Sequence, residues 1–298
     1  MANDSLQQAQ AALSELIEAA RTGAIIPIRL TGQLEALGDL LAKASEEAEK
    51  AAQKAASAQP PELAEYIKEQ GEFVSVAVHD LRSPLTAVRG YADMLNTPAM
   101  GELTDMQKQF LVVIRSNVKR MEGLLTDVSD VNKLRSNRLR LAPKMDMAKN
   151  VLGMVEKQMR PLADELGRTL TFDIPQGLPI LNLDGEILVR VLVKLVENAL
   201  RYSPQEDAEV VISAAADDSN LIITVRDNGI GMMPEELEQL QKRELYWRSE
   251  NEDVRAFKGS GLGIPIAYGL IEHLEGSIAV ESEAGAGTMF TLRLPGMS

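Results

Sequence analysis

One of the two histidines in the chain, His79, is followed directly by an acidic residue, Asp80. A neutral imidazole has a pKa of about 6.5, so an exposed histidine is a competent nucleophile near neutral pH. A neighbouring carboxylate can accept the Nδ1 proton, fix the tautomer and stabilise charge as Nε2 attacks. The pair therefore indicates nucleophilic chemistry at His79, although a His-Asp pair alone is more often an incidental part of a helix surface.

Two glycine-containing loops much later in the chain have features of a nucleotide site. Asp227-Asn228-Gly229-Ile230-Gly231 follows a predicted strand, where a carboxylate can accept a hydrogen bond from an adenine amino group and glycines permit close backbone approach. Gly259-Ser260-Gly261-Leu262-Gly263 opens a predicted helix, whose N-terminus offers free N–H groups to phosphates. Each pattern alone is also compatible with ordinary turns.

A further set of polar residues lies on a predicted helix that ends before Ser203-Pro204. Asn198 offers a side-chain oxygen to Mg²⁺, and Arg201, on the next turn, can contact a phosphate. The second histidine, His273, is expected in the last turn of a helix, where a partly positive imidazole complements the helix dipole. We expect no catalytic role for it.

The order of these motifs, completed by Gly285-Ala286-Gly287-Thr288, resembles that of the sensor histidine kinases of two-component systems. The resemblance covers about Tyr66 to Pro295. It implies a phosphoacceptor hairpin of the HisKA type, followed by an ATP-binding domain of the type shared with gyrase and heat-shock chaperones. It also implies ATP and Mg²⁺ as cofactors, a homodimer, and the receiver domain of a response regulator as partner.

The same resemblance implies roles for individual residues. His79 would be the phosphoacceptor and Asp80 its acid/base partner, while Asn198 would bind Mg²⁺ and Asp227 would anchor the adenine. The other expected nucleotide contacts belong to the end of the asparagine helix, the lid and the glycine loops: Arg201, Tyr202, Gly229, Gly231, Arg248, Gly259, Gly261, Leu262, Gly263 and Thr288.

Three positions depart from the family pattern. Lys194 stands one turn before Asn198, where the family usually has a second asparagine, and it either adds a phosphate contact or weakens Mg²⁺ binding. Tyr246-Trp247-Arg248 replaces the usual Phe-Tyr-Arg before the lid. Ser83 stands where phosphatase-competent relatives have Thr or Asn, which leaves a phosphatase activity open.

The elements that must position these residues follow from apolar periodicity. From Leu30 to Ala55, leucines and then alanines recur at spacings of four and three, which is typical of a coiled coil, with a single amphipathic helix packed on its own domain as the alternative. A helix is predicted over 62–96, and a capping box from Thr104 to Gln107 starts a second helix that runs to about Leu134. Such an antiparallel hairpin should pair with a second copy as a four-helix bundle.

Beyond Pro143 the pattern becomes mixed and indicates an α+β two-layer sandwich. The predicted helices are 147–166, 185–202 and 263–274, and the predicted strands are 169–174, 209–214, 221–227, 277–281 and 288–294. We therefore expect three parts. Residues 1–61 form a coiled-coil signalling segment, 62–142 the dimerisation and histidine phosphotransfer domain, and 143–298 the catalytic ATP-binding domain.

Composition excludes several classes of protein. A net charge of −13 argues against nucleic acid as the main ligand. The absence of cysteine excludes disulfides, thiolate-ligated zinc and thiol catalysis. No apolar run approaches the length of a membrane span, so we expect a soluble, cytoplasmic chain without a membrane segment.

These observations favour a dimeric kinase that autophosphorylates His79 and passes the phosphoryl group to an aspartate of a response regulator. ATP hydrolysis as the main activity is disfavoured, because the related hydrolases use a glutamate one turn before the metal-binding asparagine and this chain has Lys194 there. A degenerate ATP-binding scaffold without phosphotransfer is the alternative.

Overall fold

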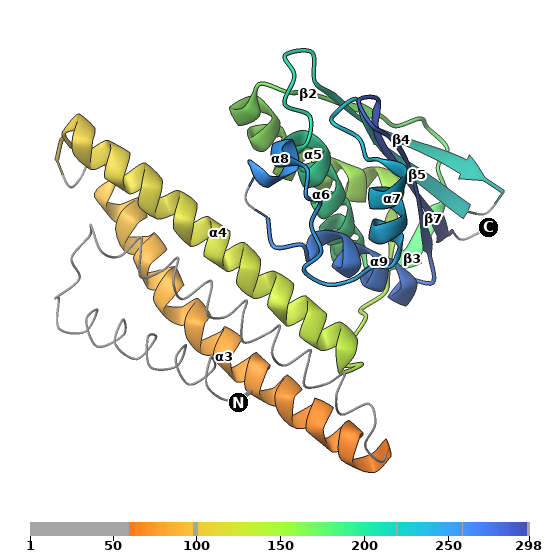
Figure 1. Cartoon of the computed structure of the whole chain (residues 1–298), viewed down its shortest axis with the longest axis horizontal. Coiled ribbons are helices and arrows are strands. Elements are labelled where there is room, and N and C mark those ends of the chain that lie inside the picture. The colour runs from red at the N-terminus through yellow and green to blue at the C-terminus, as the bar shows by residue number, and fades with distance from the viewer. Residues whose placement is uncertain (1–59, 98–100, 219, 258, 297–298) are drawn as a thin grey trace. The chain divides into compact units, whose positions relative to one another are not determined.

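The structure, a computed structural model, describes residues 60–97, 101–218, 220–257 and 259–296. The chain divides into two compact units, one ending at Asn137 and one beginning at Arg138, and Figure 1 shows the described elements of both. The heptad pattern between Leu30 and Ala55 lies outside the described residues.

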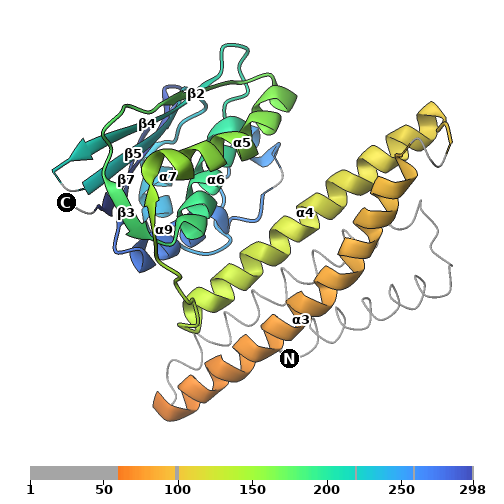
Figure 2. The same ribbon diagram turned by 180° about the vertical axis from the view of Figure 1, so that it is seen from behind.

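The first unit contains a hairpin of two long helices, α3 (Pro60–Leu95) and α4 (Asp105–Arg135), which run antiparallel in both views (Figures 1 and 2). The predicted capping box of α4 is confirmed. The Thr104 hydroxyl accepts a hydrogen bond from the Gln107 backbone N–H, and the Gln107 side chain accepts one from the Thr104 backbone N–H at 2.8 Å. The end of the hairpin loop that leads into α4 is thus anchored locally.

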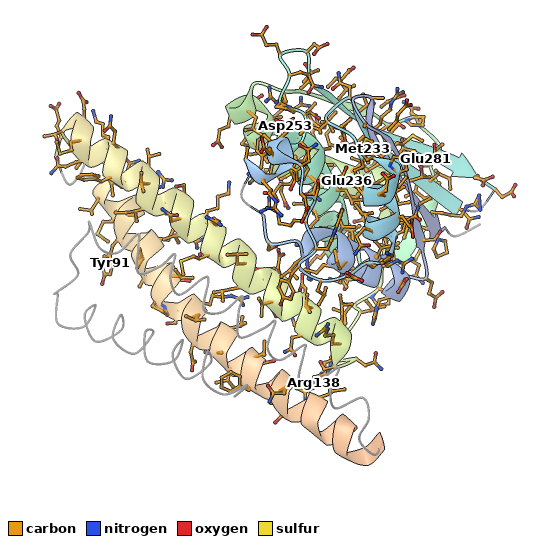
Figure 3. The ribbon with its side chains drawn as sticks, viewed as in Figure 1. Tyr91, Arg138, Met233, Glu236, Asp253 and Glu281 are labelled. Atoms are coloured by element: carbon orange, nitrogen blue, oxygen red, sulfur yellow. The ribbon has the colours of Figure 1, made fainter. Side chains whose placement is uncertain are left out.

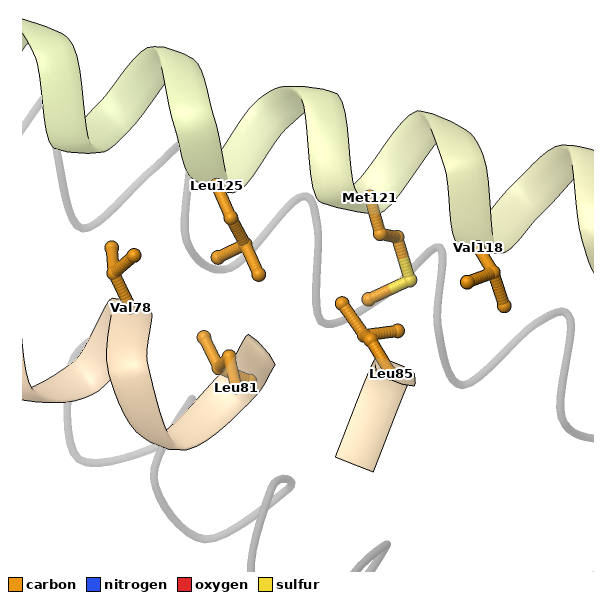
Figure 4. Close-up of a cluster of buried hydrophobic side chains, with 6 residues drawn as sticks. All are labelled: Val78, Leu81, Leu85, Val118, Met121 and Leu125. Carbon is orange, nitrogen blue, oxygen red and sulfur yellow. The ribbon is translucent and has the colours of Figure 1, made fainter. Parts of the chain in front are cut away.

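Apolar side chains at helical spacing hold the hairpin together, as Figure 4 shows. The buried cluster takes three residues from each helix: Val78, Leu81, Leu85, Val118, Met121 and Leu125. Phe110 and Val113 share the apolar period of α4 but are 48% and 45% exposed in the single chain. The hairpin therefore keeps apolar surface that its own two helices do not cover.

The second unit is built on a five-stranded sheet of order β2-β4-β5-β7-β6. Its strands are β2 (Thr169–Asp173), β4 (Glu209–Asp217), β5 (Asn220–Asp227), β7 (Gly287–Pro295) and β6 (Ser277–Glu283). The β2–β4 pair is parallel and the other neighbours are antiparallel. Every predicted strand is present.

Three helices pack together and cover one face of this sheet: α5 (Ala148–Leu166), α6 (Gly185–Arg201) and α9 (Gly263–His273) (Figures 1 and 2). Helix α6 is central and buries Leu188, Leu192 and Leu195 completely. Gly167 ends α5 in the left-handed conformation with φ 67°, as its position in the sequence predicts. The predicted fold, a helical hairpin followed by an α+β two-layer sandwich, is confirmed.

Four short elements are additions to the prediction. Strands β1 (Lys144–Met147) and β3 (Ile180–Leu183) pair as a separate two-stranded antiparallel sheet. Helices α7 (Pro234–Gln241) and α8 (Glu252–Arg255) lie between β5 and α9. Among the helices in the described ranges, none is long and apolar enough to cross a membrane.

Candidate functional site

The side chain of His79 projects from α3 into solvent. Because Val78, Leu81 and Leu85 take the inward positions, His79 and Asp80 face outward, with 84% and 60% of their side chains exposed. Nδ1 of His79 lies 3.1 Å from Oδ1 of Asp80. A proton on Nδ1 can therefore be donated to the carboxylate, which leaves the Nε2 lone pair directed to solvent. Within this unit the geometry is that of an accessible nucleophile with its tautomer held.

A buried carboxylate, Asp227, closes the end of β5. Its side chain is 7% exposed, and Oδ1 accepts hydrogen bonds from the backbone N–H of Gly229 at 2.9 Å and of Thr288 at 3.1 Å. Burial raises the pKa of Asp227 from 3.8 to about 6, against the smaller lowering effect of these two bonds. The hydrogen bond from the Thr288 N–H to Asp227 also links strand β7 to the end of β5.

The loop after Asp227 packs so closely on its neighbours that only glycine fits. A Cβ added to Gly229 would lie 2.3 Å from the carbonyl oxygen of Tyr202. Gly231 has φ +64°, and a Cβ there would lie 1.9 Å from the carbonyl oxygen of Glu283. The backbone N–H of Ile230 donates to the Tyr202 carbonyl at 2.9 Å. This loop is therefore fastened to the C-terminal end of α6, where the polar helix residues lie.

That end of α6 presents half-buried side chains of Asn198, Arg201 and Tyr202. The guanidinium of Arg201 is already engaged, because it donates from Nε and one Nη to Oε1 of Glu197 at 3.1 and 2.7 Å. A phosphate contact by Arg201 would have to compete with this ion pair. Lys194, one turn before Asn198, is also half-buried.

The second glycine loop reaches the same end of α6. A Cβ on Gly263 would lie 3.8 Å from Nδ2 of Asn198, and a Cβ on Gly259 would lie 3.6 Å from the Tyr202 hydroxyl. Leu262 between them is 2% exposed and anchors the loop in the core. The N-terminus of α9, at Gly263, therefore faces Asn198, which is the arrangement expected around bound phosphates.

Residues 242–257, which we call the lid, lie between α7 and this loop. Arg248 donates to the backbone carbonyls of Val254 at 3.1 Å and Phe257 at 2.5 Å. The hydroxyl of Ser249, 8% exposed, donates to Glu236, which also caps α7 through the Met233 N–H at 2.9 Å. Figure 3 labels both Glu236 and Met233. The expected phosphate ligand Arg248 is thus held by its own segment.

The sequence-predicted residues fall into two groups. His79 and Asp80 belong to the first unit, and hydrogen bonds and close packing join the nucleotide motifs into one cluster in the second. Sequence reasoning missed Phe257, whose ring meets that of Tyr202 edge-on at 5.8 Å between centroids. It also missed Ser203, fully buried and bonded to the Ala199 carbonyl at 2.8 Å. An aromatic residue beside the glycine loop was the only available signal for Phe257.

The donor set of the second unit fits a nucleotide-bound metal better than a protein-bound one. Within the described residues, no group of three or more His, Asp or Glu side chains is arranged to hold a metal ion. Mg²⁺ typically takes one or two protein oxygens and completes its shell with phosphates and water. Asn198, whose Nδ2 lies nearest to Gly263 at the start of α9, also carries a side-chain oxygen that fits that requirement.

Two family models match the chain in succession. Residues 69–137 match the "His Kinase A (phospho-acceptor) domain". Residues 183–297 match the "Histidine kinase-, DNA gyrase B-, and HSP90-like ATPase". The first model covers the α3–α4 hairpin with His79, and the second covers every nucleotide motif described above.

Curated relatives include the histidine protein kinase DivJ of Caulobacter vibrioides, 29% identical over 76% of this chain and 37% of its own. Sensor protein SrrB of Staphylococcus aureus is 30% identical over 75% of this chain and 38% of its own. The chain therefore spans well under half the length of these two relatives.

Solved structures of histidine kinases resemble the chain in fold. Full-length ShkA in complex with AMPPNP aligns with a TM-score of 0.62 at 25% identity, over 76% of this chain and 46% of that one. Histidine kinase AdeS of Acinetobacter baumannii aligns with a TM-score of 0.51 at 20% identity, over 74% of this chain and 98% of that one. The second likeness supports the fold alone.

Proposed function

Because the chain belongs to the sensor histidine kinases, we propose that it binds ATP in its second unit and transfers the γ-phosphoryl group to His79. The observation that carries this proposal is the convergence of the separate motifs on one place. The loop of Asp227, the end of α6 and the loop before α9 are joined by contacts at Tyr202 and Asn198. Ordinary turns at these three places in the sequence would not be expected to lie against one another.

Recognition of the adenine would depend on Asp227. Its Oδ1 atom accepts both backbone bonds, so Oδ2 is the oxygen placed to accept from the adenine amino group. Tyr202 would pack against the base, and the N–H groups of Gly261 and Gly263 would face the phosphates. A bound Mg²⁺ would neutralise charge on the phosphates, and Asn198 would supply its protein ligand.

The transfer itself requires little more of the protein than positioning and charge. With Nδ1 donating to Asp80, Nε2 of His79 attacks the γ-phosphorus, the bond from phosphorus to the bridging oxygen breaks, and ADP departs. Asp80 stabilises the imidazolium that forms and accepts its Nδ1 proton. We further propose that the phosphoryl group passes to an aspartate in the receiver domain of a response regulator, because this is the usual role of the family.

Dimerisation is part of the same proposal. The hairpin exposes Tyr91, Met94, Phe110, Val112 and Val113 in the single chain, and a second hairpin would bury such surface in a four-helix bundle. Light scattering of the chain at micromolar concentration should give the mass of two chains, whereas a monomer would contradict this part. The division into residues 1–61, 62–142 and 143–298 also stays a proposal.

The proposal is tested by incubation with γ-labelled ATP and Mg²⁺. A kinase acquires a label that is stable in alkali and lost in acid, and a receiver domain then removes it. A scaffold would bind ATP without becoming labelled, and a hydrolase would release labelled phosphate without a labelled intermediate. Either of these outcomes refutes phosphotransfer while leaving nucleotide binding in place.

A further inference from the structure

The side chain of Asn228, directly after Asp227, is bonded to residues between α6 and β4 and at the start of β4. Its Oδ1 atom accepts hydrogen bonds from the Glu209 backbone N–H at 2.8 Å and from Nε2 of Gln205 at 2.9 Å. Its Nδ2 atom donates to the Asp207 carbonyl at 3.0 Å. Although Asn228 is exposed, its amide is therefore engaged with neighbouring protein groups, and it ties the connection between α6 and β4 to the end of β5.

The connection between α6 and β4 is itself fastened to the start of β2. The guanidinium of Arg168 donates from Nη1 to the Gln205 carbonyl at 3.1 Å. The backbone N–H of Thr169, the first residue of β2, donates to the Ala208 carbonyl at 3.0 Å. The backbone on both sides of the Gln205 side chain is thus fixed, so this side chain extends from a supported position.

A hollow beside Asn228 separates the two segments that these bonds join. It has a volume of about 340 Å³ and is bordered by Pro204 and Gln205 on one segment and by Asn228 and Ile230 on the other. The glycine loop would have room to shift into this hollow if the bonds of Asn228 were lost. Hydrogen bonds, rather than apolar packing, therefore fix the position of Asn228.

The peptide group between Asn228 and Gly229 links Gln205 to the buried carboxylate. On one side of this group, the Asn228 carbonyl accepts a hydrogen bond from Nε2 of Gln205. On the other side, the Gly229 N–H donates to Oδ1 of Asp227 at 2.9 Å. Because a peptide group is planar, holding its carbonyl also fixes the direction of its N–H. Hydrogen bonds in series also strengthen one another, so the amide of Gln205 affects the bond that orients Asp227.

We propose that Gln205 is a positioning residue for adenine recognition: through the peptide group between Asn228 and Gly229, its amide holds the Asp227 carboxylate with Oδ2 directed to the base. This inference rests on the proposed function, since it assigns a residue that acts on the same site through Asp227. Gln205 itself touches no nucleotide atom in this account. Its contribution is to preorganise the carboxylate before the base arrives.

A double-mutant cycle tests this coupling, with affinity for AMPPNP in the presence of Mg²⁺ measured by calorimetry. Gln205→Met keeps the length of the side chain and removes its donor, so affinity should fall by about three- to tenfold, the factor for one neutral hydrogen bond. In a chain that already carries Asp227→Asn, the same substitution should lower affinity by less than about twofold. The atom facing the base is then an amide nitrogen, which no orientation makes an acceptor. Gln239→Met is the matched control, because Gln239 is also half-buried and its Nε2 donates to Glu244 instead.

An affinity of Gln205→Met equal to that of the Gln239→Met control overturns the inference. So does a loss of the same factor with and without Asp227→Asn, which would mean that Gln205 supports the loop as a whole rather than Asp227. Asn228→Ala is a second variant that removes the Oδ1 acceptor of the Gln205 amide, and its loss of affinity should depend on Asp227 in the same way. If the unaltered chain binds no AMPPNP, the proposed function fails and this inference fails with it, whereas normal binding with additive losses refutes the inference alone.

Discussion

Replacing Asp227 with asparagine should make the second unit more stable and its nucleotide affinity lower. Burial holds the pKa of Asp227 at about 6, whereas an ordinary aspartate has 3.8. The difference is about 2 units, and each unit corresponds to about 1.36 kcal/mol, so ionised Asp227 costs the folded unit up to about 3 kcal/mol relative to its protonated form. Asparagine keeps an oxygen for the Gly229 and Thr288 N–H groups and removes the charge.

The pH dependence follows from the direction of this shift. Between about pH 4 and about pH 6 the folded chain holds a proton on Asp227 that the unfolded chain has released, so the stability of the wild-type chain falls as pH rises through this window. Above about pH 7 Asp227 is ionised in both the folded and the unfolded chain, so its full destabilising effect is present. The stabilisation by Asp227→Asn should therefore be largest at pH 8 and shrink toward zero at about pH 4.

Trp247 fluorescence during heating measures the melting temperature of the second unit, because the only tryptophan of the chain belongs to it. For a unit of this size each kcal/mol moves the melting temperature by about 2–4 °C, so a rise of several degrees is expected at pH 8. Calorimetry with AMPPNP should show affinity lower by about ten- to a hundredfold, since a hydrogen bond to a charged group contributes about 1.5–3 kcal/mol. Asp207→Asn, an exposed carboxylate on a neighbouring loop, should change neither quantity. A lower melting temperature for Asp227→Asn at pH 8 would refute the account of the buried charge, and equal affinities would remove Asp227 from the base pocket.

Two further predictions concern the hairpin and the metal. Leu125→Ala shortens a buried side chain of the hairpin cluster, and it should lower the free energy of unfolding of the first unit in urea by about 2–5 kcal/mol. Leu124→Ala, at a half-buried position, should lower it by less. Equal losses of stability for the two variants would contradict the observed packing. Lys194→Asn should weaken ATP binding at low Mg²⁺ if the ammonium contacts a phosphate, which we favour, whereas faster autophosphorylation at every Mg²⁺ concentration would mean that Lys194 repels the metal. Superimposable Mg²⁺ titrations would show that it does neither.

The main elements could be predicted because their signals are local. Periodicity marks α3, α4 and α6, the capping box at Thr104 marks where α4 begins, and Gly167 marks where α5 ends. Strands β1 and β3 were missed because each has only four residues. Each is a strand only because it pairs with the other, which lies more than thirty residues away in the sequence. Helix α7 is too short and polar to show an apolar period, and its local signals are Pro234 at its start and Glu236 in its first turn.

The site was predictable in its residue types and less so in their partners. The positions of Asp227, Asn198 and the glycines follow from motif order, but nothing local indicates that Arg201 pairs with Glu197 or that Arg248 binds lid carbonyls. The contact of Phe257 with Tyr202 joins residues 55 positions apart in a segment without regular periodicity. Such contacts depend on how the lid folds back, which a pattern of residue types does not encode.

The central claim is that His79 carries the phosphoryl group, and intact-mass spectrometry at alkaline pH tests it most directly. After incubation with ATP and Mg²⁺ the chain should gain the mass of a single phosphoryl group, and acid should remove it. His79→Gln should gain nothing while still binding AMPPNP. His273→Gln, which alters the only other histidine, should gain the phosphoryl group as the unaltered chain does. Phosphorylation that persists in His79→Gln would contradict the account.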